Sequence, residues 1–87
     1  ATLRIRPAAQ KSLAEMDSAV AKAARESAAP DAEKKGWLRV EIPIESVERT
    51  ARTLLALGAD VEVLGPAALR ARVAALAKEI AKRYQPI

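Results

Sequence analysis

Three short segments of this chain alternate apolar and polar side chains, the pattern of strands with one buried face. They are Thr2-Leu3-Arg4-Ile5-Arg6, the run from Trp37 to Ile44, and Asp60-Val61-Glu62-Val63-Leu64. In the middle run Leu38, Val40, Ile42 and Ile44 point one way, and Trp37, Arg39 and Glu41 the other. We expect strands at about residues 2–6, 37–44 and 60–64.

Between these segments, apolar residues recur at helical spacing. The pattern predicts helices at about residues 7–25, 46–57 and 66–84. The last helix has the longest stripe, which runs through Leu69, Val73, Leu76, Ile80 and Tyr84, so we expect Tyr84 in the core. Residues 26–36 contain Pro30, small residues and charges without a period, and are predicted to be a loop.

Local signals support these bounds. Pro7 and Pro66 suit the first turn of a helix, and Ser46 is a typical N-cap residue. Gly58 stands where a helix end needs a left-handed residue. Pro43 cannot donate to a sheet, so the Trp37 strand should end there or lie at an edge, where it would be a candidate docking site.

The predicted order is β-α-β-α-β-α within one domain, residues 1–87. Strict parallel winding would need strands that are apolar on both faces. Because every strand alternates, we expect an α+β fold with helices on one face of the sheet. A ferredoxin-like split β-α-β sandwich fits this pattern, with the first strand between the other two.

Composition narrows the chemistry. The chain has neither Cys nor His, which removes thiolate chemistry, the commonest general base and the commonest metal ligand. We therefore expect no catalytic residues, metal or cofactor, and a protein that is not an enzyme. No apolar run is long enough to span a membrane. A cytoplasmic setting is expected, and the missing initiator Met suggests a piece of a longer protein.

One candidate binding surface is the outward row of the sheet. There Arg4, Arg6 and Arg39 flank Trp37, so a phosphate backbone and a stacked base have a possible platform. The alternative is that Arg4 and Arg6 pair with Glu41, Asp60 or Glu62. We favour the ion-pairing interpretation because these acids nearly cancel the charge.

A second candidate is the basic face of the last helix. Residues 1–65 hold ten basic and ten acidic side chains, so the net charge of +4 arises from residues 66–87. The cations there are Arg70, Arg72, Lys78, Lys82 and Arg83. They would suit nucleic acid or an acidic partner, although a solvated face that complements the helix dipole is the favoured reading.

Part of the chain also resembles a known family. This part is the run Leu54-Leu55-Ala56-Leu57-Gly58-Ala59-Asp60-Val61-Glu62-Val63-Leu64-Gly65-Pro66-Ala67-Ala68-Leu69-Arg70, and the resemblance closes at Tyr84. It is similar to the C-terminal extension (WCX-type) domain of WYL-domain helix-turn-helix transcriptional regulators. The opening Leu3-Arg4-Ile5-Arg6-Pro7 and the Gly36-Trp37…Val40 strand look like that extension's earlier strands. Family members often have another strand before the Trp strand, where residues 18–35 here are Ala-rich.

The resemblance implies a ferredoxin-like regulatory module with roles in effector sensing, inter-domain contact and assembly. Its partners would be the WYL and helix-turn-helix domains of a parent regulator and a second copy in a homodimer, with nucleic acid bound through the parent. Two alternatives stay open. They are direct binding of single-stranded nucleic acid at Arg4, Arg6, Trp37 and Arg39, and small-molecule binding.

Overall fold

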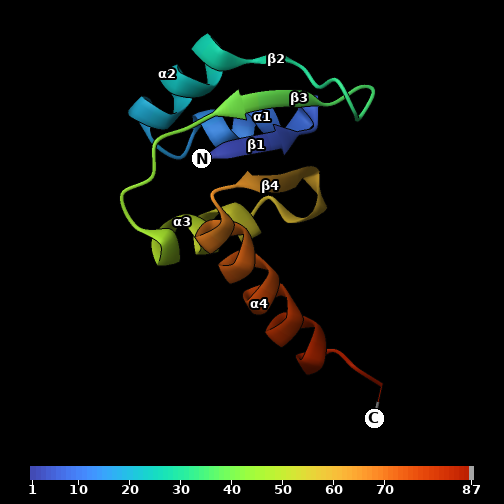
Figure 1. The fold of residues 1–87 in the computed structure, drawn as a ribbon. Helices are drawn as coiled ribbons and strands as arrows, with labels where there is room; N and C mark the ends of the chain where they lie inside the picture. The colour runs from blue at the N-terminus through green and yellow to red at the C-terminus, as the bar shows by residue number, and fades with distance from the viewer. Residues whose placement is uncertain (87) are drawn as a thin grey trace.

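The computed structural model describes residues 1–86, which form an α+β fold (Figure 1). Within this range there are four α-helices and a four-stranded antiparallel sheet. The elements are β1 (Thr2–Ile5), α1 (Pro7–Ala14), α2 (Ser18–Ser27), β2 (Ala29–Pro30), β3 (Leu38–Glu41), α3 (Val47–Leu55), the 3-10 turn η1 (Gly58–Asp60), β4 (Val61–Gly65) and α4 (Ala67–Arg83).

The first strand lies inside the sheet, as the alternation predicted. The strand order is β2-β3-β1-β4, and β1 pairs antiparallel with both β3 and β4. Leu3 stands opposite Val40 on one side and Val63 on the other. All three side chains are buried, because alternation carries them to the same face of the sheet.

The segment predicted as a loop contains a fourth strand, β2. Ala29 and Pro30 pair with Arg39 and Leu38. The expectation of three strands, with a loop throughout residues 26–36, is therefore wrong. β3 is also not the bare edge that was expected to offer a docking site. Two residues are too few to show alternation, and Pro30 suits an outer strand because it has no amide to donate.

The helix predicted over residues 7–25 is two helices, α1 and α2. The apolar stripe continues across the break, since Leu13 and Ala24 are both buried. The Asp17 side chain accepts a hydrogen bond from the Ala19 amide at 2.7 Å and caps α2. This side-chain cap starts a new helix where periodicity alone suggests continuity. The correction changes the element order to β-α-α-β-β-α-β-α.

The remaining bounds are close to those expected. Ser46 caps α3 by accepting from the Arg49 amide at 3.2 Å, and Gly58 has φ of 61° after that helix. β3 ends at Glu41, two residues before Pro43. Pro66 is the N-cap of α4.

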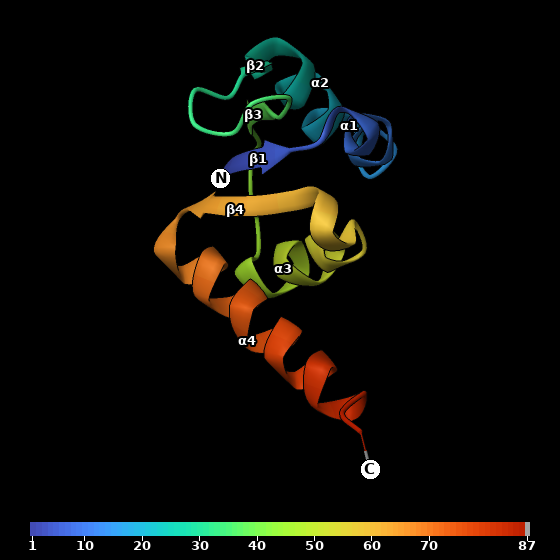
Figure 2. The same cartoon turned by 90° about the vertical axis from the view of Figure 1, so that its right-hand side faces the viewer.

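Helices cover one face of the sheet and leave the other to a loop. Figure 2 shows α1, α2 and α3 on one side, and the segment after β2 on the other. The core lies between helices and sheet. Its largest fully buried side chains are Leu3, Ile5, Leu13, Val40, Leu54 and Leu69. Small residues of the helices, among them Ala9, Ala24 and Ala51, allow close approach to the sheet.

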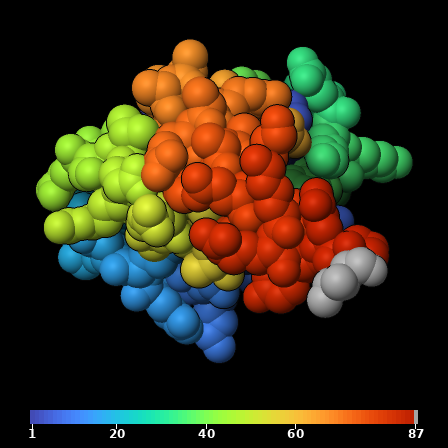
Figure 3. Space-filling model, turned by 90° about the horizontal axis from the view of Figure 1, so that it is seen from below, coloured from blue at the N-terminus to red at the C-terminus, as the bar shows by residue number. Residues whose placement is uncertain are grey.

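The last helix packs on the body only over its first half. α4 contacts β4 and α3, and it covers much of the underside seen in Figure 3. Leu69 and Leu76 are buried, but Ile80 is 48% exposed and Tyr84 83% exposed. The expectation that Tyr84 is a core residue is wrong. The helix continues past the edge of the domain (Figure 1). Ile80 and Tyr84, the last apolar residues of its stripe, lie on this exposed part.

Candidate functional site

Arg4 lies at the middle of the open sheet face, but it is covered. The segment that follows β2 folds over it, and Arg4 is only 8% exposed. Its Nε donates to Asp31 Oδ2 at 2.9 Å, and its two terminal nitrogens lie 3.2 Å from carboxylate oxygens of Glu33 and Glu62. Three carboxylates therefore surround one guanidinium, and Arg4 is not available to an external phosphate.

Asp31 organises the covering segment. Its Oδ2 accepts from the amides of Glu33 and Lys34 at 3.0 and 2.7 Å, besides the bond from Arg4. Burial acts to raise the pKa of Asp31, but the Lys34 amide and the Arg4 guanidinium outweigh it, and this pKa lies below its ordinary value. The carboxylate thus stays charged and ties the loop to β1.

Glu62 on β4 closes this network from the other side. Its Oε1 accepts from Arg4 at 3.2 Å and from Lys34 at 3.5 Å. Burial acts to raise the pKa of Glu62, but Arg4 and Lys34 together lower it. The sequence-based expectation that acids neutralise Arg4 is correct for Glu62. The contributions of Asp31 and Glu33 were not foreseen, because both lie in the segment predicted to be a loop.

Trp37 is a half-buried ring between two cations. Lys34 Nζ lies 4.1 Å and the Arg6 guanidinium carbon 5.1 Å from the ring centroid, both within cation–π range. Arg6 also pairs with Asp60, with 3.3 Å between Nε and Oδ1. Part of the ring face therefore already contacts cations of the same chain.

Among the residues predicted to form a binding surface on the sheet, Arg39 is the cation that remains accessible. It is exposed on β3, opposite Arg4, and has no ion pair within residues 1–86. The four residues predicted for this surface therefore differ in how accessible they are to a ligand. Arg4 is structural, Arg6 is paired but exposed, and Trp37 and Arg39 retain accessible surface.

The basic residues predicted on α4 also differ, since some are bonded to the body of the domain and others lie on the exposed end of the helix. Arg72 binds Glu48 of α3 through two hydrogen bonds of 2.6 and 3.1 Å, and Arg70 donates to the Val63 carbonyl at 2.9 Å. Arg52 binds the same Glu48 carboxylate. Hydrogen bonds from Arg72 and Arg52 lower the pKa of Glu48 to about 2. Arg70 and Arg72 therefore fasten α4 to the body, whereas Lys78, Lys82 and Arg83 lie on its exposed end.

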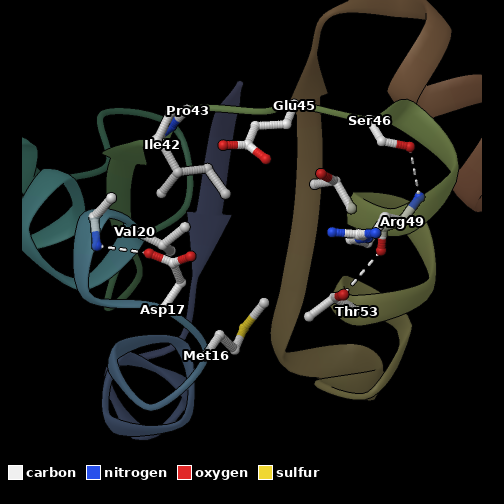
Figure 4. Close-up of a pocket in the computed structure, with 11 residues that line it drawn as sticks. Met16, Asp17, Val20, Ile42, Pro43, Glu45, Ser46, Arg49 and Thr53 are labelled. Atoms are coloured by element: carbon white, nitrogen blue, oxygen red, sulfur yellow. Dashed lines mark hydrogen bonds between the residues drawn. The ribbon is translucent and has the colours of Figure 1, made fainter.

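A groove of about 190 Å³ opens between α2 and α3 on the helical side. Figure 4 shows apolar side chains on one side and polar side chains of α3 on the other. The apolar residues are Met16, Val20 and Ile42, and the polar residues include Arg49, Thr50 and Thr53. Its lining comes from the beginning of α2, whose N-cap is Asp17, from the segment after β3, and from α3.

Opposite charges line this groove without pairing to each other. Glu45, just before α3, directs its carboxylate towards the opening, and Arg49 lies on the α3 wall (Figure 4). Neither side chain forms a salt bridge with any of residues 1–86. Sequence reasoning missed this site because Arg49 and Glu45 belong to no motif, and the turn that opens the groove was not predicted.

Other chemistry finds no support in the described part of the chain. Among residues 1–86 no group of three or more acidic, His or Cys side chains is arranged to hold a metal ion. The helices within that range are also too short or too polar to cross a membrane.

A search of the curated proteins returned no match, and neither did a search of the solved structures. A scan of protein-family models gave a clear result: the model described as WCX domain matches residues 1–81. The match spans the whole sheet, the groove and all of α4 except Lys82 and Arg83. It confirms the resemblance drawn from residues 54–70, and the chain belongs to the WCX domain family.

Proposed function

We propose that this chain is a non-catalytic regulatory and assembly module of a WYL-type transcriptional regulator. The observation that carries the proposal is the WCX match over residues 1–81, since that family suggests a regulatory accessory domain of such regulators. The absence of His and Cys from the chain agrees with a role that depends on contacts rather than on catalysis.

We also assign the sheet to the ferredoxin-like split β-α-β arrangement. Supporting observations are the position of β1 between β3 and β4, the antiparallel pairing of all neighbours, and the helices on one face. In this arrangement the helical layer and the opposite face of the sheet are separate surfaces. One surface can therefore contact a neighbouring domain while another remains free.

The exposed end of α4 is the surface best suited to assembly. From Ala77 to Pro86 every residue is exposed, and Ile80 and Tyr84 place large apolar groups there. Lys78, Lys82 and Arg83 lie beside them. Such a combination suits a partner with an apolar patch and acidic surroundings. We propose the WYL or helix-turn-helix domain of the parent regulator, or the second copy of a homodimer, as that partner.

Removal of this module from the parent regulator tests the proposal. We expect the truncated regulator to retain a folded helix-turn-helix domain that binds operator DNA, but with altered oligomeric state and altered response to its inducing signal. Gel-shift titration and light scattering measure these properties. The double substitution I80A/Y84A in the full regulator should reproduce the assembly defect. A parent protein without a DNA-binding domain would overturn the proposal.

A second candidate is direct binding of single-stranded nucleic acid, favoured by the accessible part of Trp37 and by the unpaired Arg39. Phosphate contacts predict affinity that falls steeply with salt. A labelled oligonucleotide titrated at two salt concentrations, with W37A and R39Q as variants and R25Q as a control, measures this. Lack of binding at low salt would dismiss the candidate.

A further inference from the structure

We propose that the groove between α2 and α3 binds a free α-amino acid with an apolar side chain. The proposal rests on the regulatory function argued above, for which it names the class of effector. The structure combines three features at this place: the exposed guanidinium of Arg49, an apolar surface between two helices, and two exposed carboxylates. Of the carboxylates, Asp17 accepts from the Ala19 amide, whereas Glu45 has no partner within residues 1–86.

The charges match a zwitterion. Arg49 presents an unpaired guanidinium, whose planar fork suits a carboxylate. Glu45 presents an unpaired carboxylate towards the same opening (Figure 4), which suits an ammonium group. Both side chains remain unpaired although they line one groove. A ligand that carries both charges on one carbon can engage the two at once.

The apolar side selects the side chain of the ligand. Met16, Val20 and Ile42 form this side, and Ile42 is only 5% exposed. A flexible thioether such as that of Met16 adapts to aliphatic groups of different shape. An aliphatic side chain would remove apolar surface from water here, whereas an anionic one would lose hydration and meet the Asp17 carboxylate.

The size of the groove limits the ligand further. An apolar cavity of about 150 Å³ holds a benzene molecule, and this groove measures about 190 Å³. It therefore accommodates a compact amino acid such as leucine or valine. Cofactors and nucleotides are much larger than the groove.

Binding would also affect the rest of the domain through α3. The helix that carries Arg49 also carries Glu48, which holds Arg72 of α4. A ligand that fixes the beginning of α3 against α2 therefore acts next to the anchor of α4. This proximity gives the groove a physical connection to the surface proposed for assembly.

The test is an NMR titration of the 87-residue chain with L-leucine. We expect the largest amide shifts in the groove, at Met16, Val20, Thr50 and their neighbours, and smaller ones along α3 towards Glu48. 4-Methylpentanoic acid lacks the ammonium group, and 3-methylbutylamine lacks the carboxylate. Each should bind at least tenfold more weakly than L-leucine, and L-aspartate should cause no shifts at the apolar side.

Variants test the assigned roles. R49Q and E45Q should each weaken L-leucine binding at least tenfold, whereas R25Q and E26Q, on the exposed surface of α2 outside the groove, should not change it. Thermal unfolding of each variant checks the fold.

Two results would overturn the assignment. One is the absence of shifts in the groove with the wild-type chain and L-leucine or L-valine. The other is equal affinity for L-leucine and its two singly charged analogues. Either result leaves the regulatory function standing, because that function is tested separately by removal of the module from the parent.

Discussion

Arg4 and Asp31 form a buried ion pair that joins the central strand to the segment crossing the open sheet face. The Nε–Oδ2 distance is 2.9 Å, and the two residues are 8% and 7% exposed. Asp31 also accepts from two loop amides. The Asp31 carboxylate therefore holds the conformation of this segment and also pairs with Arg4, the charge at the centre of the sheet.

This pair leads to the first prediction. D31A should lower the thermal midpoint by several degrees, because it leaves the Arg4 guanidinium buried with fewer partners and frees the Glu33 and Lys34 amides. E33Q should change the midpoint much less, since the Glu33 side chain is 81% exposed. Thermal unfolding followed by circular dichroism measures both. Equal effects of the two variants would contradict the central role of Asp31.

Glu48 leads to a prediction on pH. Arg72 and Arg52 lower its pKa to about 2 from the usual 4.5. A depressed folded-state pKa stabilises the protein above the unfolded value, and this contribution is lost as the pH falls from about 4.5 towards 2. Asp31 and Glu62 shift in the same direction. Stability should therefore decline through this window.

E48Q should flatten that decline only in part, because Asp31 and Glu62 still titrate. Urea unfolding midpoints measured from about pH 6 down to about pH 2 give the two slopes. Since Glu48 is nearly half exposed, added salt should reduce the difference between wild type and E48Q. Parallel pH profiles would show that the Glu48 bridge adds nothing to folding.

The two halves of α4 should respond differently to the loss of apolar side chains. L76A removes a side chain that is 6% exposed, and should destabilise the fold by about 2–4 kcal/mol. I80A and Y84A should lie within about 0.5 kcal/mol of the wild type, because these side chains face solvent. Chemical denaturation of the three variants measures these differences in the free energy of unfolding. A large effect of Y84A would mean that the helix end packs on this domain after all.

Gly58 supports a prediction on backbone conformation. Its φ of 61° lies in the left-handed region, so G58A should cost about 1 kcal/mol, and G58N less. Gly65 is the matched control, since its φ is not positive and a Cβ there would meet nothing within 4 Å. G65A should be nearly neutral. Similar losses at both positions would argue that the conformation of Gly58 does not matter.

Periodicity predicted the main elements because each apolar stripe corresponds to a buried face. The alternation of Leu3 and Ile5 indicated the inner face of β1, and the spacing of Ala51 and Leu54 that of α3. The break before α2 depends instead on one side chain that bonds a backbone amide. Asp17 followed by Ser18 is a typical N-cap sequence, and this signal was available.

The candidate site was less predictable than the fold. The alternation placed Arg4 on the outward face correctly, but it contains no information on what covers that face. The partner Asp31 is distant in sequence, in a segment without periodicity. For Tyr84 the stripe indicated the side of the helix but not where the body ends. The groove was not predicted because its lining comes from residues 16–20 and 42–53, which are distant in the sequence.

The exposed part of α4 has a mechanical consequence. A helix is stiff and extends about 1.5 Å per residue, and this one is fixed near its root by Arg70 and Arg72. It is therefore a rigid rod that is held at one end. A small tilt of α4 about this root moves Tyr84 further than any residue of the packed half. The exposed tip is therefore the place where a small change in packing at the root produces the largest displacement.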